Sequence, residues 1–278
     1  MPLRGRNRGV RHHPPAFPPD PGPGPAVSPS SAPQRLLAVL AAFDHDHPAL
    51  SLTDISRRAG LSLTTAHRLV GALTAWGALE RDQAGTYHVG LRLWEVAALS
   101  PRGLALRQVA LPYLEDLYEA THENVQLAVR DGSEVVYTEW ISGRSAVGVK
   151  IQVGARWPLH ATGVGLAMLA HCEPAFQEEY CAGPLAVFTA HTVADPAALR
   201  RVLAEVRRTG VAVSVRQITD DALSVAAPVR GADGAVGAAV SVVVPERGAQ
   251  TAALVPAVRI AARGISRALG WHPEPSGR

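Results

Sequence analysis

The sequence predicts an α+β protein of two domains. Three observations predict it. Capped helical segments fill residues 34–77, and a short hairpin follows them. Beyond residue 104, strand-like segments joined by tight turns mix with helical ones. The 278 residues are enough for two hydrophobic cores.

Residues 1–33 precede the first helical pattern. They hold ten prolines, four arginines and one aspartate, with no hydrophobic period. Such a segment cannot bury enough apolar area to offset its ordering entropy, so we expect a disordered tail. Its arginines either lie in solvent or contact nucleic-acid phosphates.

Three helices are expected next. The first covers residues 34–43. The second begins at Ser51 with a capping-box pattern and ends at Gly60. The third begins at Ser62, a favourable N-cap, and ends at Gly77.

The third helix has two different faces. Apolar residues recur with helical spacing on one face, at Ala66, Leu69, Val70 and Leu73. Polar residues crowd its N-terminal turns. Two short strands then flank the turn residues 83–85. Three helices and a hairpin, with a tight turn between the second and third helices, are typical of a winged helix-turn-helix over residues 34–90.

In that fold the second helix of the motif enters the DNA major groove, and its N-terminal residues reach base edges. We therefore expect the polar end of the third helix to contact duplex DNA, with further contacts from the hairpin. The alternatives are an exposed helix without a DNA partner and a sensor that acts through protein contact. The candidate DNA-binding residues are Ser62, Thr64, Thr65, His67, Arg68, Arg81, Tyr87 and His88.

The second domain is expected over residues 104–272, after a linker helix at 91–103 and before a tail at 273–278. A hairpin crosses Asp131-Gly132, and a helix capped by Asp195 runs to Gly210. Further helices are expected at 104–122, 161–171 and 251–270, and strands at 211–215, 222–230 and 235–245.

The sequence lacks a catalytic or metal-binding pattern. Cys172 and Cys181 match no strong zinc spacing, and we expect inert thiols, although neighbouring His171 and Glu173 leave a thiol nucleophile open. Residues 45–47 could ligate a metal but also suit a turn. We expect no enzyme activity, cofactor or metal. The longest apolar run has ten residues, so we expect a cytoplasmic protein without membrane contact.

Several segments in order carry a family resemblance: "LTDISRRAGLSLTTAHRLVGAL", "YHVGLRLWEVA", "VGARWPLHATGVGLAMLAH", "SVAAPVRGADGAVGAAVSVVV" and "ISRALG". With this order and spacing the chain resembles the IclR family of bacterial transcriptional regulators. The resemblance implies a dimerising linker helix and a GAF-like effector domain with a curved antiparallel sheet. It also implies a homodimer or homotetramer, acting as a repressor on an inverted-repeat operator and responding to a small organic acid.

The resemblance also implies an effector pocket, lined by Val147, Val149, Gly163, Val164, Ser214 and Ser224. His160 either orients a ligand carboxylate or pins its loop to the following helix. That helix, capped by Thr162, offers free N–H groups to a carboxylate. The chain differs from the family pattern in having Leu166 for a lysine and Gln217 for an acidic residue. We therefore expect an acid with an apolar body, held by backbone and hydroxyl groups. A third difference, Ser62-Leu63 for Pro-Lys, removes a cation from the recognition helix.

Overall fold

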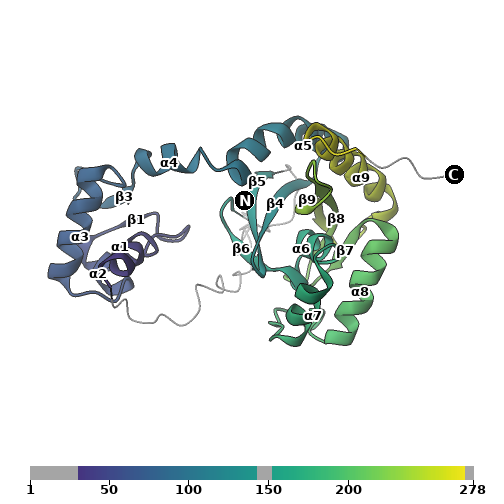
Figure 1. Cartoon of the computed structure of the whole chain (residues 1–278), viewed down its shortest axis with the longest axis horizontal. Helices are drawn as coiled ribbons and strands as arrows, with labels where there is room; N and C mark the ends of the chain where they lie inside the picture. Colours follow the sequence, from purple (N-terminus) through teal and green to yellow (C-terminus); the bar gives the residue numbers. More distant parts are fainter. Residues whose placement is uncertain (1–30, 143–151, 273–278) are drawn as a thin grey trace, which may run out of the picture.

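A computed structural model describes residues 31–142 and 152–272 (Figure 1). The expected tails at 1–33 and 273–278 lie outside the described residues, apart from residues 31–33. Two separately packed parts are visible in Figure 1, a smaller N-terminal domain and a larger C-terminal one, with α4 running between them.

The N-terminal domain confirms the three helices and the hairpin. A serine caps each helix, since Ser31, Ser51 and Ser62 each accept a hydrogen bond from the backbone N–H three residues on. The strands form a small antiparallel sheet in the order β1-β3-β2. The elements are α1 (Ala32–Leu40), β1 (Ala49–Leu50), α2 (Leu52–Arg58), α3 (Leu63–Trp76), β2 (Leu79–Arg81) and β3 (Tyr87–Val89).

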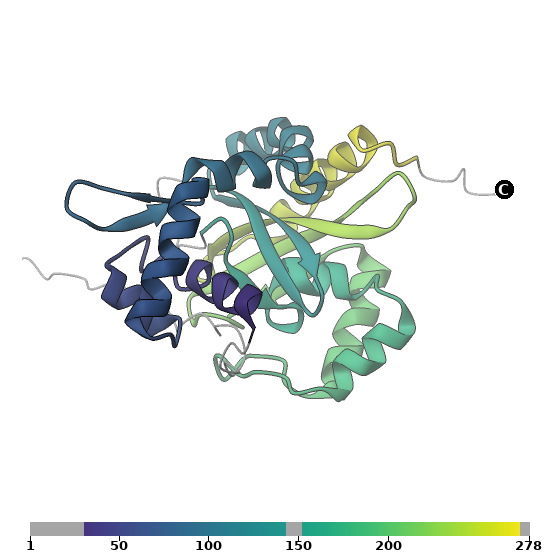
Figure 2. The ribbon, with the colours of Figure 1, turned by 60° about the vertical axis from the view of Figure 1, so that its left-hand side comes forward.

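The β2–β3 hairpin projects from this domain. Its strands pair from Leu79↔Val89 to Arg81↔Tyr87, and the turn lies at the predicted position. Figure 2 shows the hairpin extending away from the helices. β1, which the sequence did not predict, pairs with the other side of β3. β3 is therefore the central strand of this sheet.

The connection to the second domain is a broken helix. α4 (Leu91–Ala97) ends earlier than the expected linker helix, and a π-helical turn (Pro101–Ala105) leads into α5 (Leu106–Thr121). None of the residues of α4 is buried. Leu91, Trp94 and Leu99 are each more than half exposed, so this segment presents an apolar surface.

The C-terminal domain is built on a six-stranded, fully antiparallel sheet in the order β6-β5-β4-β9-β8-β7. The predicted hairpins are confirmed, with Asp131 paired to Glu134 in the first. β6 was not predicted. The strands are β4 (Asn124–Asp131), β5 (Glu134–Ile141), β6 (Arg156–Pro158), β7 (Ala212–Val215), β8 (Ala222–Arg230) and β9 (Val236–Pro245).

Helices cover both faces of this curved sheet. α5 packs beside α9 (Thr251–Ala268) on one face, as Figure 1 shows. α6 (Gly163–Leu169) packs on the other face, against β8 and β9, with α8 (Pro196–Thr209) behind it. α7 (Pro174–Ala182), which the sequence did not predict, packs on α8. The two faces form separate apolar clusters.

α6 is the most deeply placed helix of this domain, because all seven of its residues are buried. Thr162 caps it, as predicted, by accepting a hydrogen bond from the N–H of Gly165 (3.0 Å). A Cβ at position 165 would lie 2.2 Å from the carbonyl oxygen of Leu159. The close approach of α6 to the preceding turn therefore requires glycine at this position.

We expect Gly165→Ala to destabilise the protein by about 1–3 kcal/mol, the usual range for overpacking a close contact. Gly71→Ala is the matched control, because position 71 lies on an exposed part of α3 with nothing within 4 Å of a new Cβ. That change should stabilise α3 by about 0.5–1 kcal/mol. Urea unfolding measures the change in the free energy of unfolding of both variants. An unchanged free energy in Gly165→Ala contradicts the packing argument.

Candidate functional site

The first candidate site is the N-terminal half of α3. Its apolar face is buried at the four predicted positions. Thr64, His67 and Arg68 are exposed on the opposite side. Thr65 is half-buried, and its hydroxyl lies 2.9 Å from the hydroxyl of the N-cap Ser62. The exposed face can therefore meet a partner without disturbing the core.

Arg68 differs from the nearby arginines of α2. Arg57 lies 2.6 Å from the carboxylate of Asp54, and Arg58 forms an ion pair with Asp44. Among residues 31–142 and 152–272, Arg68 has neither an ion pair nor a hydrogen bond. Its charge is therefore available to an external anion.

The hairpin adds two exposed or half-exposed polar side chains. The Arg81 guanidinium lies 5.5 Å from the ring centroid of Tyr87, and its Nε donates to the carbonyl of Gly85 (3.3 Å). His88 Nε2 lies 3.0 Å from a carboxylate oxygen of Asp82.

The expectation that Tyr87 contacts DNA requires correction. Its side chain is 8% exposed and belongs to the core of the N-terminal domain. Leu50 of the unpredicted β1 pairs with Tyr87 and belongs to the same apolar core.

The second candidate site is a narrow cavity of about 50 Å³ between the start of α6 and the sheet. Three predicted pocket residues, Gly163, Ser214 and Ser224, line it. Val147 and Val149 lie outside the described residues. The other lining residues are Gln126, Tyr137, Trp157, Ala161, Thr162, Gln217, Ile218, Thr219, Ala222 and Val243. None of these side chains is charged at neutral pH.

Gly163 sets the width of this cavity. A Cβ there would lie 2.6 Å from the hydroxyl oxygen of Ser224 and 3.1 Å from its Cβ. The two positions therefore face each other directly, and a larger residue at either one would fill the space between them.

Two polar groups of the cavity have no partner in the described structure. Gln126 is buried, and its Nε2 makes no hydrogen bond, although its Oε1 lies 3.3 Å from the hydroxyl of Ser241. The hydroxyl of Thr219 is likewise buried without a partner. Buried polar groups are nearly always hydrogen-bonded, because leaving one unpaired costs about 1–3 kcal/mol. A ligand oxygen would satisfy the Gln126 amide.

Sequence reasoning missed Gln126 for a physical reason. β4 is covered on both faces, and six of its residues in succession are buried. The alternation that separates inward from outward positions is therefore absent. The signal that remains is a glutamine within a strand that is otherwise largely apolar.

Tyr137 adds a further donor at the cavity wall. Burial raises the pKa of its phenol, while a side-chain hydrogen bond with Thr162 acts in the opposite direction. The phenol therefore stays protonated at physiological pH. Gln217 is held in place by the N–H of Val193, which donates to its Oε1 (3.3 Å).

Two comparisons of the whole sequence agree with this architecture. Residues 32–83 match the family described as the IclR helix-turn-helix domain. Residues 98–267 match the family described as the bacterial transcriptional regulator IclR C-terminal domain. The chain belongs to the IclR family of bacterial transcriptional regulators.

Characterised IclR relatives cover most of the chain. The HTH-type transcriptional regulator XynR of Escherichia coli K12 is 32% identical over 75% of this chain and 83% of its own length. The glycerol operon regulatory protein of Streptomyces coelicolor is 30% identical over 85% and 95%. An IclR homologue from Microbacterium hydrocarbonoxydans, solved with 4-hydroxybenzoate, is 40% identical over 84% and 97%, with a TM-score of 0.81.

Family membership confirms the predicted fold. It also confirms that the chain belongs to a class of regulators rather than enzymes, since these relatives are transcriptional regulators. α3 lies within the residues that match the family's helix-turn-helix domain. The chain is a DNA-binding regulator of transcription.

Two of the expected effector residues lie outside the cavity of this IclR protein. His160 is buried, with Nδ1 2.9 Å from the hydroxyl of Tyr180 and Nε2 2.9 Å from the carbonyl of Ala186. Both ring nitrogens are therefore occupied, and the ring pins its loop to α7. Val164 packs into the core on the sheet side of α6. Neither residue lines the cavity.

The thiols have the environment of structural residues. Cys172 and Cys181 are both free, and burial raises the pKa of each thiol. A reactive thiol would need a lowered pKa instead. Over the described ranges, no group of three His, Cys, Asp or Glu residues could hold a metal ion. Within the same ranges, no helix has the length and hydropathy needed to cross a bilayer.

His160 predicts a pH effect on stability. Burial lowers its pKa in the folded protein, while a hydrogen bond to Ala186 acts against this shift. The unfolded chain therefore takes up a proton near the ordinary pKa of about 6.5, which folded His160 resists. The free energy of unfolding should fall as pH drops below about 6.5, and less so in His160→Gln. Urea unfolding between pH 5 and 8 tests this, and an equal slope in both proteins contradicts it.

Proposed function

We propose that this protein is a repressor that binds an inverted-repeat operator in the cytoplasm, and that a small organic acid in the cavity beside α6 modulates this binding. The observation that carries the proposal is the pairing of two surfaces. One is an exposed polar helix face with an uncompensated arginine. The other is an uncharged cavity with unpartnered polar groups.

In the proposed complex α3 lies in the major groove. Thr64 and His67, the exposed polar residues of its first two turns, contact base edges, with Ser62 and Thr65 at the helix start. Arg68 binds a phosphate, because it is a free cation beside these residues. Arg81 and His88 extend the contact to the DNA backbone through the hairpin, which projects from the domain (Figure 2).

The proposed assembly is a symmetric homodimer or homotetramer. One recognition helix reads too few bases to select a site in a genome, whereas two helices on an inverted repeat double the contact. The exposed apolar residues Leu91, Trp94 and Leu99 give the linker segment a surface suited to a second copy.

The proposed effector is a compact aromatic or aliphatic acid. 4-Hydroxybenzoate is the ligand of the 40% identical structure. The cavity of about 50 Å³ must widen to admit such a molecule, and its lining offers both apolar and hydrogen-bonding groups. Trp157 and Ile218 offer apolar walls, while the amide of Gln126 and the hydroxyls of Ser214, Ser224 and Thr219 offer hydrogen bonds. Side-chain groups carry this role rather than the helix dipole, because α6 has only seven residues.

Arg68→Ala should weaken binding about equally for operator and non-operator duplexes. It should also lower the salt slope of log K by about one unit, because one phosphate contact is lost. Arg57→Ala, which removes an arginine already paired with Asp54, is the matched control and should leave the slope unchanged. Fluorescence anisotropy over a salt series measures both. Equal slopes for Arg68→Ala and the parent would exclude this phosphate contact.

At about 100 times its dissociation constant, 4-hydroxybenzoate should stabilise the protein by roughly 2.7 kcal/mol and raise the Tm by about 5–10 °C. Ser224→Leu fills the space opposite Gly163 and should abolish this rise. Gln126→Leu should reduce it by removing the unpaired amide.

Ser133→Leu, at the exposed β4–β5 turn outside the cavity, serves as the control. Differential scanning fluorimetry gives the readout, with anisotropy to check that operator binding survives. An undiminished rise in Ser224→Leu would place the acid elsewhere on the chain.

Trp94→Asp should convert the assembly toward monomers, because a buried carboxylate in an apolar interface is strongly unfavourable. Light scattering of the parent should give at least twice the chain mass, and the variant a lower mass. Val187→Asp, at an exposed apolar residue of the C-terminal domain, is the control. A parent that stays monomeric at micromolar concentration rules out the dimer.

A further inference from the structure

A second, larger cavity lies between the end of α8, the end of β8 and α9. Its volume is about 350 Å³. Among the described residues no aspartate or glutamate lines it, and the uncharged lining includes Ser266, Trp271 and Pro228. Five arginines line it, Arg207, Arg208, Arg230, Arg259 and Arg263. We call this the arginine groove.

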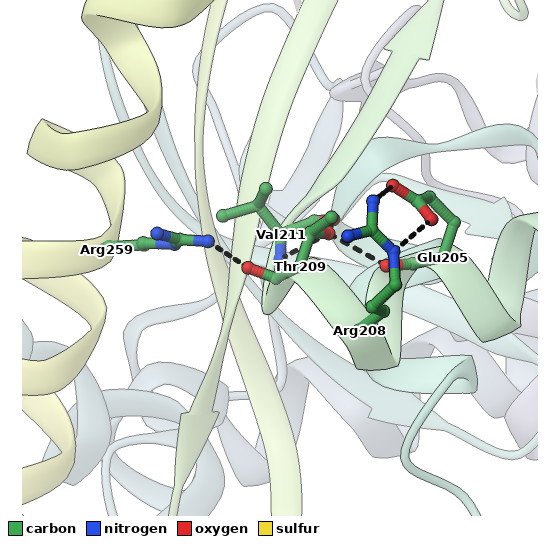
Figure 3. A network of polar contacts seen from close by, with 5 residues as sticks. All are labelled: Glu205, Arg208, Thr209, Val211 and Arg259. Atoms are coloured by element: carbon green, nitrogen blue, oxygen red, sulfur yellow. Dashed lines mark hydrogen bonds and ion pairs between the residues drawn. The ribbon is translucent and has the colours of Figure 1, made fainter.

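Four of the five arginines are not neutralised. Of these five arginines, only Arg208 has a carboxylate partner among the described residues, Glu205, at 2.5 Å. Figure 3 shows this pair beside Arg259, which reaches from α9 to the backbone carbonyl of Thr209. Arg263 has no ion pair or hydrogen bond within residues 31–142 and 152–272.

Arg207 and Arg230 also bind neutral acceptors. Arg207 donates to the carbonyl of Ala170 (3.2 Å) and to the side-chain oxygen of Gln177 (3.1 Å). Arg230 donates to the carbonyl of Gly234 (2.9 Å). These bonds orient the guanidinium groups but cancel none of their charge. Within residues 31–142 and 152–272, four of the groove's five arginines therefore have no carboxylate partner.

Helix capping explains part of this arrangement. Arg207 and Arg259 satisfy carbonyls at the C-terminal ends of α6 and α8, where cations are favourable. Capping uses one or two of the five donors of a guanidinium. It does not explain why Arg230 and Arg263, which cap neither helix, gather at the same cavity. Like charges so close together are unfavourable unless an anion lies between them.

His171 supplies an independent observation at the same place. It lines the groove, and its Nε2 is buried without a hydrogen-bond partner in the described structure. Burial, together with the positive charges of Arg230 and Arg207, lowers its pKa to about 4. A buried ring nitrogen normally has a partner, so this one points to a group that the groove receives.

We propose that the arginine groove binds a small polyanion, a molecule with at least two negative charges on phosphate or carboxylate groups. Guanidinium groups bind both oxyanions through paired hydrogen bonds, and four free charges match a multiply charged ligand. The volume lies at the lower end of the range for small-molecule sites, about 300–1,000 Å³. No described residue that lines the cavity beside α6 is charged, so we expect the two sites to select different ligands. The proposal for the arginine groove does not depend on the proposed effector.

The test uses isothermal titration calorimetry of the full chain at constant ionic strength. The probes are pyrophosphate for phosphate groups and citrate for carboxylate groups, with sodium chloride and monovalent benzoate as references. We expect one pyrophosphate or citrate to bind per chain. Arg263→Gln, which breaks no hydrogen bond of the described structure, should weaken binding about tenfold, and Arg207→Gln/Arg263→Gln more.

The matched control is Arg201→Gln/Arg267→Gln, which changes two exposed arginines on the same helices outside the groove. Its affinity for pyrophosphate and citrate should stay within about twofold of the parent, because it keeps all five groove arginines. The loss of one charge-assisted hydrogen bond would lower the affinity by more than twofold. Equal losses in the control and groove variants overturn the proposal, because they would show non-specific charge attraction. The proposal is also overturned if pyrophosphate and citrate both bind no tighter than benzoate.

Two further readouts separate macromolecular partners from a small ligand. Light scattering of Arg263→Gln should give the parent mass, and a lower mass would make the groove a subunit interface instead. Operator affinity without added anion should also match the parent. A reduced affinity would assign the groove to the DNA backbone and overturn the proposal.

Discussion

The burial of α6 against the sheet determines the rest of the C-terminal domain. Gly165 lets the helix approach the carbonyl of Leu159, and Gly163 lets its first turn approach Ser224 on β8. A larger side chain at position 163 would push the helix from the sheet, and one at position 165 would push it from the preceding turn. The cavity that we propose for the effector therefore lies at one end of α6, where Thr162 caps the helix. Arg207 binds the carbonyl of Ala170 at the other end, and the arginine groove begins there.

Local signals predicted much of this structure. Ser62, Thr162 and Asp195 cap helices as their residue types indicate, because a cap depends only on its own short segment. The hairpins follow from their turn residues in the same way. β1 and β6 have two and three residues, and pairing with distant strands defines them rather than any hydrophobic period. The same long-range pairing buries Tyr87, which the sequence placed on the surface.

The three sites differ in how their charge is balanced. On the N-terminal domain the arginines of α2 are paired with carboxylates, whereas Arg68 on α3 and Arg81 on the hairpin have no carboxylate partner among the described residues. The described lining of the cavity beside α6 has no charged side chain, and its polarity comes from amide groups such as that of Gln126 and from hydroxyl groups. The arginine groove concentrates the charge that total composition hides, since the formal net charge of the whole chain is only +3. The position of the charged side chains, rather than the total charge of the chain, distinguishes the sites.

The linker between the domains has a consequence for how a signal travels. α4 has seven residues and buries none of them within its own chain. Isolated helices shorter than about 12–15 residues are marginal in water, because nucleation costs more than so few hydrogen bonds return. In a free chain α4 should therefore fray, and contact with a second copy would make it rigid. The spacing of two recognition helices would then be a property acquired on assembly, and amide exchange in α4 would slow as protein concentration rises.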